Sequence, residues 1–543
     1  MATPVEQWKP GMDLTAGRME SMNQRSSFMV TNFGADSSGG TDAAPGIQLA
    51  LNAARDLGGA QVMVPPGVYL IGQTLRIYGN TRLTLMAGAE FRRNVAATML
   101  INGDAGQPFG GYTGHSRIII EGGLWNMRGT TAGLTGSAMC ISIGHATDIL
   151  IRDLEIRDLP GFHGIELNST SHGAITGCKF RGYVDPGGRD FSEAIQIDLA
   201  KSSGVFGGFG PYDHTPCEDI LVSGCHFGAS GTAGTTAWPR GIGSHSATIT
   251  KWHRRIRISN NSFDGLLQYA VSAYNYEDLT VNGNTFVGCG SGVRLRAVIK
   301  SDPEDTKLPD GTQTGESQQM RNIAVTGNTF RDMGDYAHVI ECIGETSGTI
   351  YNLAITGNVI DNSGTTANGV RFSYVERATI VGNAIANVGN TGVSMANSNR
   401  VIVADNQVTW GHGYGMTVDT CSAVTLSGNQ VSFPGKGGIW LSSCTDVHHR
   451  GNFVKGAGRD TNATYYAFRV EGAGSSSISF SGNKARPYGS GNECIHALSC
   501  TTSVSLVQRY GNDWRGGTWT AGAANPINDS STSSNTSSAD VLT

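Results

Sequence analysis

Short runs in which apolar and polar residues alternate recur along most of the chain. Clear examples are RNIAVTG (321–327), RATIVGN (377–383) and SAVTLSGN (422–429). A period of two is that of a β-strand, and the runs are too short for a helix of ten residues or more. Gly, Asn and Ser separate the runs, so the pattern predicts many short strands joined by tight turns.

A Gly-Asn step, or a close variant of it, recurs at the end of these runs. The asparagines concerned are 284, 328, 358, 383, 406, 429, 452 and 483. Cysteine or asparagine takes the same place earlier, in TGCKF (176–180), SGCHF (223–227) and SNNSF (259–263). A unit of about 23 residues with occasional insertions is typical of a solenoid. Asparagine accepts the left-handed backbone of a tight bend and can hydrogen-bond to its copy one coil away. The prediction is an all-β chain folded as a parallel β-helix.

One segment has helical spacing instead. Residues 42–59 carry alanine and leucine at helical positions, with Pro45 near the start and Gly58 and Gly59 at the stop. The first coil of a solenoid would expose an unpaired sheet end, so this helix is expected to cap it.

Composition excludes several classes of protein. The chain has 76 glycines in 543 residues, only 15% charged residues and a net charge of -5. These values exclude a coiled coil, a helical solenoid and a charged disordered chain, and give no long-range attraction to nucleic acid or anionic lipid. No stretch of 18 apolar residues is present, and the start lacks the apolar core of a signal peptide, so neither a membrane span nor Sec-type export is expected.

No metal or cofactor is expected either. The ten cysteines are scattered without a C-x-x-C pair, and are expected to be small buried residues. Phosphate-loop, dinucleotide, G-x-S-x-G and H-E-x-x-H motifs are absent from the sequence.

Residues 31–93 resemble the opening of pectate-lyase-like β-helix proteins, including many bacteriophage tailspikes. The likeness rests on FGAD (33–36), Gly40, Asp42, the alanine-rich helix, the glycine pair and VPPGVYLIG (64–72). It implies a right-handed parallel β-helix, action on complex polysaccharides outside the cell, and a homotrimer. The first 25 residues resemble the openings of phage minor tail proteins, which implies attachment to a tail or baseplate and a place on the virion.

This gives a domain division with three parts. Residues 1–30 would be the attachment segment, residues 31–515 the catalytic β-helix, with the cap and first coils in 31–93, and residues 516–543 a low-complexity Ser/Thr/Asn tail.

Candidate site residues follow from the stacking of coils. We align GIELN (164–168), AIQID (194–198), GIGSH (241–245), AVSAY (270–274) and GVRLR (292–296). The register places Ile165, Ile195, Ile242, Val271 and Val293 inward. Two outward columns follow: Asn168, Asp198, His245, Tyr274 and Arg296; and Glu166, Gln196, Gly243, Ser272 and Arg294. At the bend just before the strand, four residues line up: His163, Glu193, Arg240 and Tyr269. Later coils carry mostly Ser, Thr and Ala at these positions, so the site is expected on the earlier coils.

Paired carboxylates suit the cleavage of a glycosidic bond, because one donates a proton and the other acts as base or nucleophile. Glu166 and Asp198 differ by one coil and two residues, or about 8 Å between Cα atoms. The expected catalytic residues are Glu166, Glu193, Asp198 and His245. The expected substrate-binding residues are His163, Gln196, Arg240, Tyr274, Arg294 and Arg296, with Asp213 and Trp238 from long insertions at the same coils. The two last arginines would bind an acidic sugar.

The order carboxylate, carboxylate, His, Arg is similar to that of polygalacturonase-type glycosidases. The tripeptides differ, since GSH (243–245) and RLR (294–296) stand where that family has G-H-G and R-I-K. The function expected is therefore a tailspike-type depolymerase that hydrolyses a bacterial surface polysaccharide. Two alternatives stay open: a lyase acting on a uronic-acid glycan, and a glycan-binding spike without activity.

Overall fold

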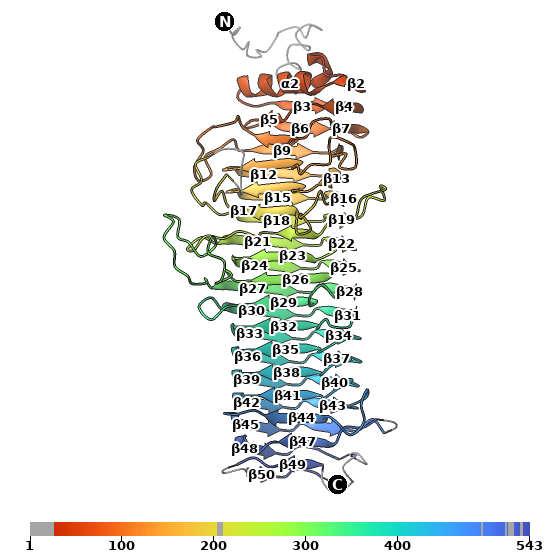
Figure 1. Cartoon of the computed structure of the whole chain (residues 1–543), viewed down its shortest axis with the longest axis vertical. Coiled ribbons are helices and arrows are strands. Elements are labelled where there is room, and N and C mark those ends of the chain that lie inside the picture. Colours follow the sequence, from red (N-terminus) through yellow and green to blue (C-terminus); the bar gives the residue numbers. More distant parts are fainter. Residues whose placement is uncertain are drawn as a thin grey trace, which may run out of the picture.

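The alternating runs form strands that stack along one axis in three parallel sheets (Figure 1). The computed structural model describes residues 27–203, 210–489, 492–515, 519, 526–532 and 536–542. Successive turns of the chain add strands to the three sheets in rotation, and every ladder pair named below is parallel. The expected right-handed parallel β-helix is confirmed. Most of the expected attachment segment, residues 1–30, lies outside the described residues.

The first sheet, sheet A, has 18 strands. They are β1 (Ser27–Met29), β3 (Gln61–Val64), β6 (Arg82–Leu85), β9 (Ile118–Glu121), β12 (Thr147–Arg152), β15 (Ser171–Thr176), β18 (Glu218–Ser223), β21 (His253–Ser259), β24 (Tyr276–Asn282), β27 (Met320–Thr326), β30 (Ile350–Thr356), β33 (Val375–Val381), β36 (Asn399–Ala404), β39 (Ser422–Ser427), β42 (Thr445–Arg450), β45 (Ser476–Ser481), β48 (Ser505–Tyr510) and β50 (Thr536–Ser538).

The second sheet, sheet B, has 16 strands. They are β2 (Ser38–Asp42), β4 (Gly67–Ile71), β7 (Ala89–Arg93), β10 (Leu124–Asn126), β13 (Glu155–Pro160), β16 (Lys179–Val184), β19 (His226–Gly228), β22 (Ser262–Asp264), β25 (Thr285–Val287), β28 (Thr329–Met333), β31 (Val359–Ser363), β34 (Ala384–Ala386), β37 (Gln407–Thr409), β40 (Gln430–Ser432), β43 (Phe453–Lys455) and β46 (Lys484–Arg486).

The third sheet, sheet C, also has 16 strands and carries the candidate site. They are β5 (Leu75–Ile77), β8 (Leu100–Asn102), β11 (Ile141–Gly144), β14 (Ile165–Asn168), β17 (Glu193–Asp198), β20 (Arg240–Gly243), β23 (Tyr269–Tyr274), β26 (Ser291–Arg296), β29 (Ile340–Ile343), β32 (Val370–Ser373), β35 (Val393–Ala396), β38 (Met416–Asp419), β41 (Ile439–Ser442), β44 (Tyr466–Glu471), β47 (His496–Cys500) and β49 (Ile527–Asp529).

Inward side chains of successive coils stack in rows that form the core, and some rows consist of one residue type. In sheet B the rings of Phe180, Phe227, Phe263, Phe286 and Phe330 stack with centroids 4.5–4.9 Å apart. This spacing is that of neighbouring strands, so offset stacking of the rings adds to the burial of their area. All ten cysteines are buried, as expected.

The repeated asparagines form a buried ladder at the bend after sheet A. Asn284, for example, directs its backbone N–H and its Nδ2 to Oδ1 of Asn328, both at 3.0 Å. The pattern continues coil by coil and ends on Asp540, which accepts from Asn512. The left-handed backbone falls on the residue before each asparagine, as at Gly327 with φ 61°, and not on the asparagine itself.

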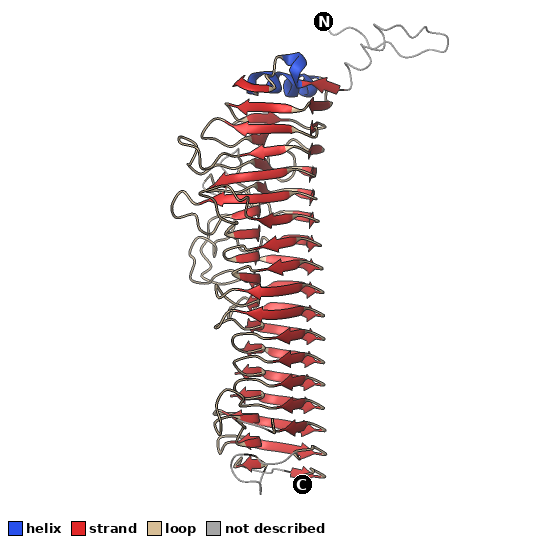
Figure 2. Cartoon of the chain, turned by 90° about the vertical axis from the view of Figure 1, so that its right-hand side faces the viewer, coloured by secondary structure: helices blue, strands red, loops and turns tan. Residues whose placement is uncertain are grey.

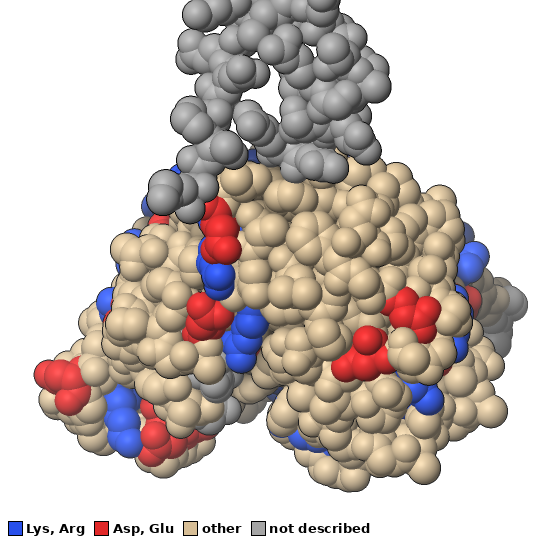
Figure 3. All heavy atoms as spheres, turned by 90° about the horizontal axis from the view of Figure 1, so that it is seen from above, with Lys and Arg blue, Asp and Glu red and all other residues tan. Residues whose placement is uncertain are grey.

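The N-terminal end is covered by helix α2 (Ala44–Asp56), which follows the 3-10 turn η1 (Val30–Phe33). Pro45 lies in its first turn and Gly58, with φ 79°, follows its end. The helix is shorter than the expected 42–59, because Asp42 is the last residue of strand β2 and a turn begins at Leu57. Seen from this end, the charged side chains lie in small groups in which opposite signs adjoin (Figure 3).

The C-terminal boundary expected at residue 515 is not seen among the described residues. Strand β49 pairs with β47, and β50 pairs with β48, so the Ser/Thr/Asn-rich segment adds further strands to sheets C and A. A sequence rich in Ser, Thr and Asn is therefore compatible with further strands of the β-helix.

The long insertions project from one side of the β-helix, over the coils between β9 and β30 (Figures 1 and 2). The coils from β33 to β43 lack such insertions. Within the described residues, no helix has the length and apolar character needed to span a membrane.

Candidate functional site

The expected register of sheet C is confirmed. Glu166 pairs with Gln196, Asn168 with Asp198, and Tyr274 with Arg296. The aligned inward isoleucines and valines are all fully buried. His245 departs from its column, because β20 ends at Gly243 and the chain turns away before reaching it.

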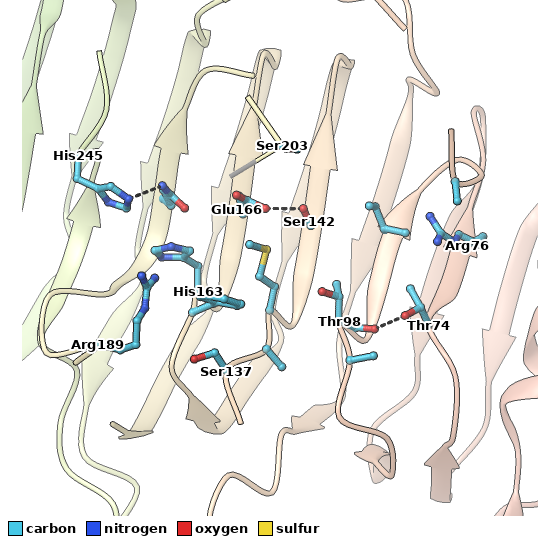
Figure 4. Close-up of a pocket in the computed structure, with 17 residues that line it drawn as sticks. Thr74, Arg76, Thr98, Ser137, Ser142, His163, Glu166, Arg189, Ser203 and His245 are labelled. Atoms are coloured by element: carbon cyan, nitrogen blue, oxygen red, sulfur yellow. Dashed lines mark hydrogen bonds between the residues drawn. The ribbon is translucent and has the colours of Figure 1, made fainter. Parts of the chain in front are cut away.

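A cavity of about 550 Å³ lies over strands β5 to β20 on the outer face of sheet C (Figure 4). Its floor includes a single ladder column, in which Arg76, Ile101, Ser142, Glu166 and Gln196 are successive partners. The other lining residues come from the turns and insertions around these strands: Thr74, Ala97, Thr98, Ala105, Ser137, Ala138, Met139, Phe162, His163, Arg189, Ser203 and His245.

Glu166 is the one carboxylate among the described residues that line this cavity. Its Oε2 accepts a hydrogen bond of 2.6 Å from the Ser142 hydroxyl, whereas its Oε1 is buried and no donor in the described part of the chain bonds to it. Burial, assisted by the nearby charge of Asp198, raises the pKa of Glu166 to about 7. The side chain therefore holds a proton during part of the time at neutral pH.

Asp198 lies one strand further on and is fully buried. Its Oδ1 accepts from the backbone N–H of Leu199 at 2.8 Å and from the Ser246 hydroxyl, and its Oδ2 accepts from Gln196 Nε2 at 2.8 Å. Burial raises the pKa of Asp198 to about 6, although His245 and these donors oppose the shift. Asp198 does not line the cavity, because the amide of Gln196 lies in front of it.

Glu193 is fully buried and bound by two cations. His245 Nδ1 lies 3.2 Å from its Oε2, and Arg240 Nη1 lies 3.3 Å from its Oε1. Burial would raise the pKa of Glu193, but His245 and Arg240 outweigh it and hold the pKa well below its ordinary value. A carboxylate that stays ionised and ion-paired is a poor proton donor, so this environment does not suit Glu193 to act as a general acid.

The two histidines of the cavity differ in charge. Burial alone would lower the pKa of His245, but the carboxylates of Glu193 and Asp198 raise it to about 9. Burial lowers the pKa of His163 to about 3, so this ring is neutral. His163 Nδ1 lies 2.9 Å from the backbone oxygen of Glu193, which can only accept, so Nδ1 carries the proton and Nε2 is an acceptor.

Three expected substrate-binding residues have structural roles instead. Trp238 is fully buried and packs on Tyr183 at 5.1 Å between centroids, so it offers no face for a sugar. Tyr274 is 3% exposed and its hydroxyl donates to Asp305 at 2.9 Å, which anchors the 299–319 insertion. Asp213 accepts from the backbone N–H of Gly111 at 2.6 Å and joins two loops.

The two arginines expected to bind an acidic sugar also lie outside the cavity wall. Arg296 forms an ion pair of 2.7 Å with Glu345. Arg294 donates to the Ser272 hydroxyl at 2.7 Å and lies over the ring of Tyr269. It stands in the column of Glu166, but three strands beyond Gln196.

The sequence did not single out Arg76, Ser142, Phe162 and Arg189, which all line the cavity. Arg76 and Ser142 lie on the column of Glu166, so extending the alignment to earlier coils would have found them. Phe162 and Arg189 come from turns, where no periodicity fixes direction. Within the described residues no group of His, Cys, Asp and Glu side chains has the geometry of a metal site.

Comparison with known proteins supports the fold. Residues 312–485 match the family described as "Right handed beta helix region". Plasmin and fibronectin-binding protein A of Streptococcus pneumoniae is 28% identical over 286 residues, which are 47% of this chain and 38% of that protein. The match thus spans less than half of this relative's length.

Solved structures show the same likeness. The pneumococcal surface protein and adhesin PfbA has a TM-score of 0.59 at 19% identity, covering 72% of this chain and 100% of that one. The family 28 exopolygalacturonase of Yersinia enterocolitica has a TM-score of 0.54 at 15% identity, with 74% and 78% covered. A tailspike of E. coli bacteriophage HK620, solved with a pentasaccharide, has a TM-score of 0.52 at 12% identity, with 81% and 80% covered. With its three parallel sheets, the chain is a right-handed parallel β-helix protein, of the fold shared by these tailspike, exopolygalacturonase and adhesin structures.

Proposed function

We propose that this protein hydrolyses glycosidic bonds of a bacterial surface polysaccharide in the cavity over sheet C. The observation that supports this most is a pair of buried carboxyl groups, Glu166 and Asp198, on adjacent strands. Their pKa values are displaced to about 7 and about 6, which suits an acid and a base working near neutral pH.

Glu166 is the proton donor in this proposal. It lines the cavity, is partly protonated at neutral pH, and has one oxygen with no hydrogen-bond partner among the described residues. A leaving glycosidic oxygen can take the place of that missing partner. The Ser142 hydroxyl holds the other oxygen and so fixes the orientation of the carboxyl group.

Asp198 is the second carboxylate. Its lower pKa leaves it mostly ionised at pH 7, which a base requires. His245, held as a cation by Glu193, lies on the far side of Gln196 and stabilises this charge. Glu193 and Arg240 position His245 in turn.

The test is oligosaccharide analysis after exposure of the protein to a panel of bacterial surface polysaccharides. We expect new reducing ends, their loss in Glu166→Gln and in Asp198→Asn, and unchanged glycan binding in both variants. Glu341→Gln is a matched control, because Glu341 is a buried carboxylate on the same column but outside the cavity. Full activity in both site variants would place the chemistry elsewhere.

A uronate lyase is the second candidate, and the position of Arg189 in the cavity favours it. Arg189 lies beside His163 (Figure 4) and can neutralise the sugar carboxylate, which a lyase requires. Products of a lyase absorb in the ultraviolet through their new double bond, and those of a hydrolase do not.

The same proposal includes the assembly of the protein and its attachment to a phage tail. We propose a homotrimeric phage tailspike attached through residues 1–30. The similarity to a pneumococcal surface adhesin gives the rival reading, a binding protein without activity. Light scattering decides the assembly, since a monomer would have the mass of one 57.1 kDa chain. Glycan binding with no release of reducing ends from any polymer would favour the rival.

A further inference from the structure

Arg189 lies in the cavity wall with its guanidinium over two phenyl rings. Its Cζ is 4.7 Å from the ring centroid of Phe162 and 4.8 Å from that of Phe191. Its Nε is buried without a hydrogen-bond partner, and no carboxylate within the described ranges lies at ion-pair distance from it. Stacking on the rings fixes the guanidinium plane and leaves its donors unused. Arg189 is thus an immobilised cation without a counter-ion in the described part of the protein.

The side chains that line the cavity carry an excess of positive charge. Arg76 and Arg189 line it, the charge of His245 is balanced by Glu193, and Glu166, the carboxyl group that lines it, is only partly ionised at neutral pH. The chain as a whole is negative, with a net charge of -5. A half-enclosed wall that gathers cations in an acidic protein favours an anionic ligand.

We propose that the cavity binds an acidic glycan, and that Arg189 binds the carboxylate of the sugar unit next to Glu166. The planar guanidinium can donate two parallel hydrogen bonds to a carboxylate, which gives both charge and orientation. This inference rests on the proposed function, because it assigns the substrate class of the same site. The acid group is then recognised by Arg189, inside the cavity, and not by Arg294 and Arg296.

Arg76 supplies a second contact at the other end of the cavity (Figure 4). It is three ladder steps from Glu166 on the same column. At about 4.8 Å a step this is about 14 Å along the axis. A polymer lying along the β-helix with an acid group on more than one unit therefore meets both arginines.

The test measures binding, not cleavage, in the inactive Glu166→Gln protein. The probes are oligosaccharides from uronic-acid-containing bacterial capsules, each paired with its carboxyl-reduced counterpart, titrated by calorimetry. We expect the acidic probes to bind and both carboxyl reduction and Arg189→Gln to weaken binding at least tenfold, with a smaller loss in Arg189→Lys. The matched control is Arg469→Gln, since Arg469 also stacks on a ring, that of Tyr466 at 4.6 Å, but lies outside the cavity. It should bind as the parent protein does.

Three results would overturn the inference: no binding of any acidic probe, equal binding of reduced probes, or an Arg189→Gln affinity equal to that of the parent. Its failure differs from that of the proposed hydrolase. If a neutral polysaccharide is cleaved and Arg189→Gln cleaves it equally well, the hydrolase stands and the acidic substrate does not. If acidic probes bind through Arg189 and no polymer is cleaved, the acidic ligand stands and the hydrolase does not.

Discussion

His245 Nδ1 lies 3.2 Å from Oε2 of Glu193, so residues 52 positions apart in the sequence form an ion pair behind the cavity wall. Glu193 is fully buried, and Arg240 binds its other oxygen. The pair keeps a cation next to Gln196 and Asp198 at neutral pH. The ionisation of the proposed base thus depends on a carboxylate that does not line the cavity.

Glu193→Gln should therefore change the pH dependence of stability. The pKa of His245 is raised to about 9 from an ordinary 6.5, so its pairing stabilises the fold fully below pH 6.5 and is lost as pH rises to 9. The variant should lose this slope, and should be less stable at pH 7 by on the order of 3 kcal/mol because Arg240 and His245 lose a buried partner. Urea unfolding at pH 6, 7.5 and 9 measures both the pH dependence and the loss of unfolding free energy. An unchanged slope would show that another group holds His245.

Glu166→Gln should act in a different pH window and with the opposite effect on stability. The pKa of Glu166 is raised to about 7 from 4.5, so burial of this carboxyl costs stability as pH rises from 4.5 to 7. The amide carries no charge to bury, so the variant should be more stable than the parent above pH 7, by up to about 3 kcal/mol. Activity should fall by about 10²–10⁴-fold. The control Glu341→Gln should keep activity, and a Glu166→Gln protein with reduced stability at pH 8 would contradict the assigned shift.

The sequence predicted the parts of this molecule that obey a period. Inward isoleucines fixed the register of sheet C, and the Gly-Asn step predicted the buried ladder, because both repeat with each coil. Glu166, Gln196, Asp198 and His163 were brought together by the same reasoning. All follow from alternation along a strand and stacking between strands.

The residues that depend on insertions were not predictable in this way. Trp238 and Asp213 were expected in the cavity and instead pack within or between loops, whereas Arg189 comes into the cavity from a turn. An insertion has no period, so the sequence does not show which of its side chains faces the sheet. Arg294 was misplaced for a related reason, since its column is correct but the cavity ends before it.

Trp238→Ala should test the structural role of this side chain. It is fully buried against Tyr183, so its removal leaves a cavity and should cost about 3–5 kcal/mol of unfolding free energy. Glycan affinity of the folded variant should be unchanged, as measured by calorimetry at low temperature. A large loss of glycan affinity with little loss of stability would show that Trp238 belongs to the binding site.

Asn406→Ala should show what the asparagine ladder contributes. Oδ1 of Asn406 accepts from the backbone N–H of Asn383 at 3.0 Å and from its Nδ2 at 2.8 Å. Alanine leaves the buried backbone N–H of Asn383 without this acceptor, whereas Nδ2 of Asn383 keeps its bond to the Ile355 carbonyl. A loss of about 1–3 kcal/mol is therefore expected in denaturant unfolding. The neighbouring exposed Gln407→Ala is the control and should change stability little. Equal effects of the two changes would mean that water replaces the lost acceptor.

The anomeric configuration of the product should be inverted. A retaining enzyme needs its second carboxylate in contact with the sugar, at about 5 Å from the first, whereas an inverting enzyme leaves room for a water between base and sugar. Asp198 is displaced from Glu166 by one strand and two residues, or about 8 Å between Cα atoms, and Gln196 separates it from the cavity. That arrangement suits a base acting on water better than a nucleophile. Proton NMR of the first product formed from a cleaved polysaccharide distinguishes the two anomers before they equilibrate. A retained anomer, or a trapped glycosyl ester on Asp198, would show that the carboxylate reaches the sugar and that Gln196 moves aside during the reaction.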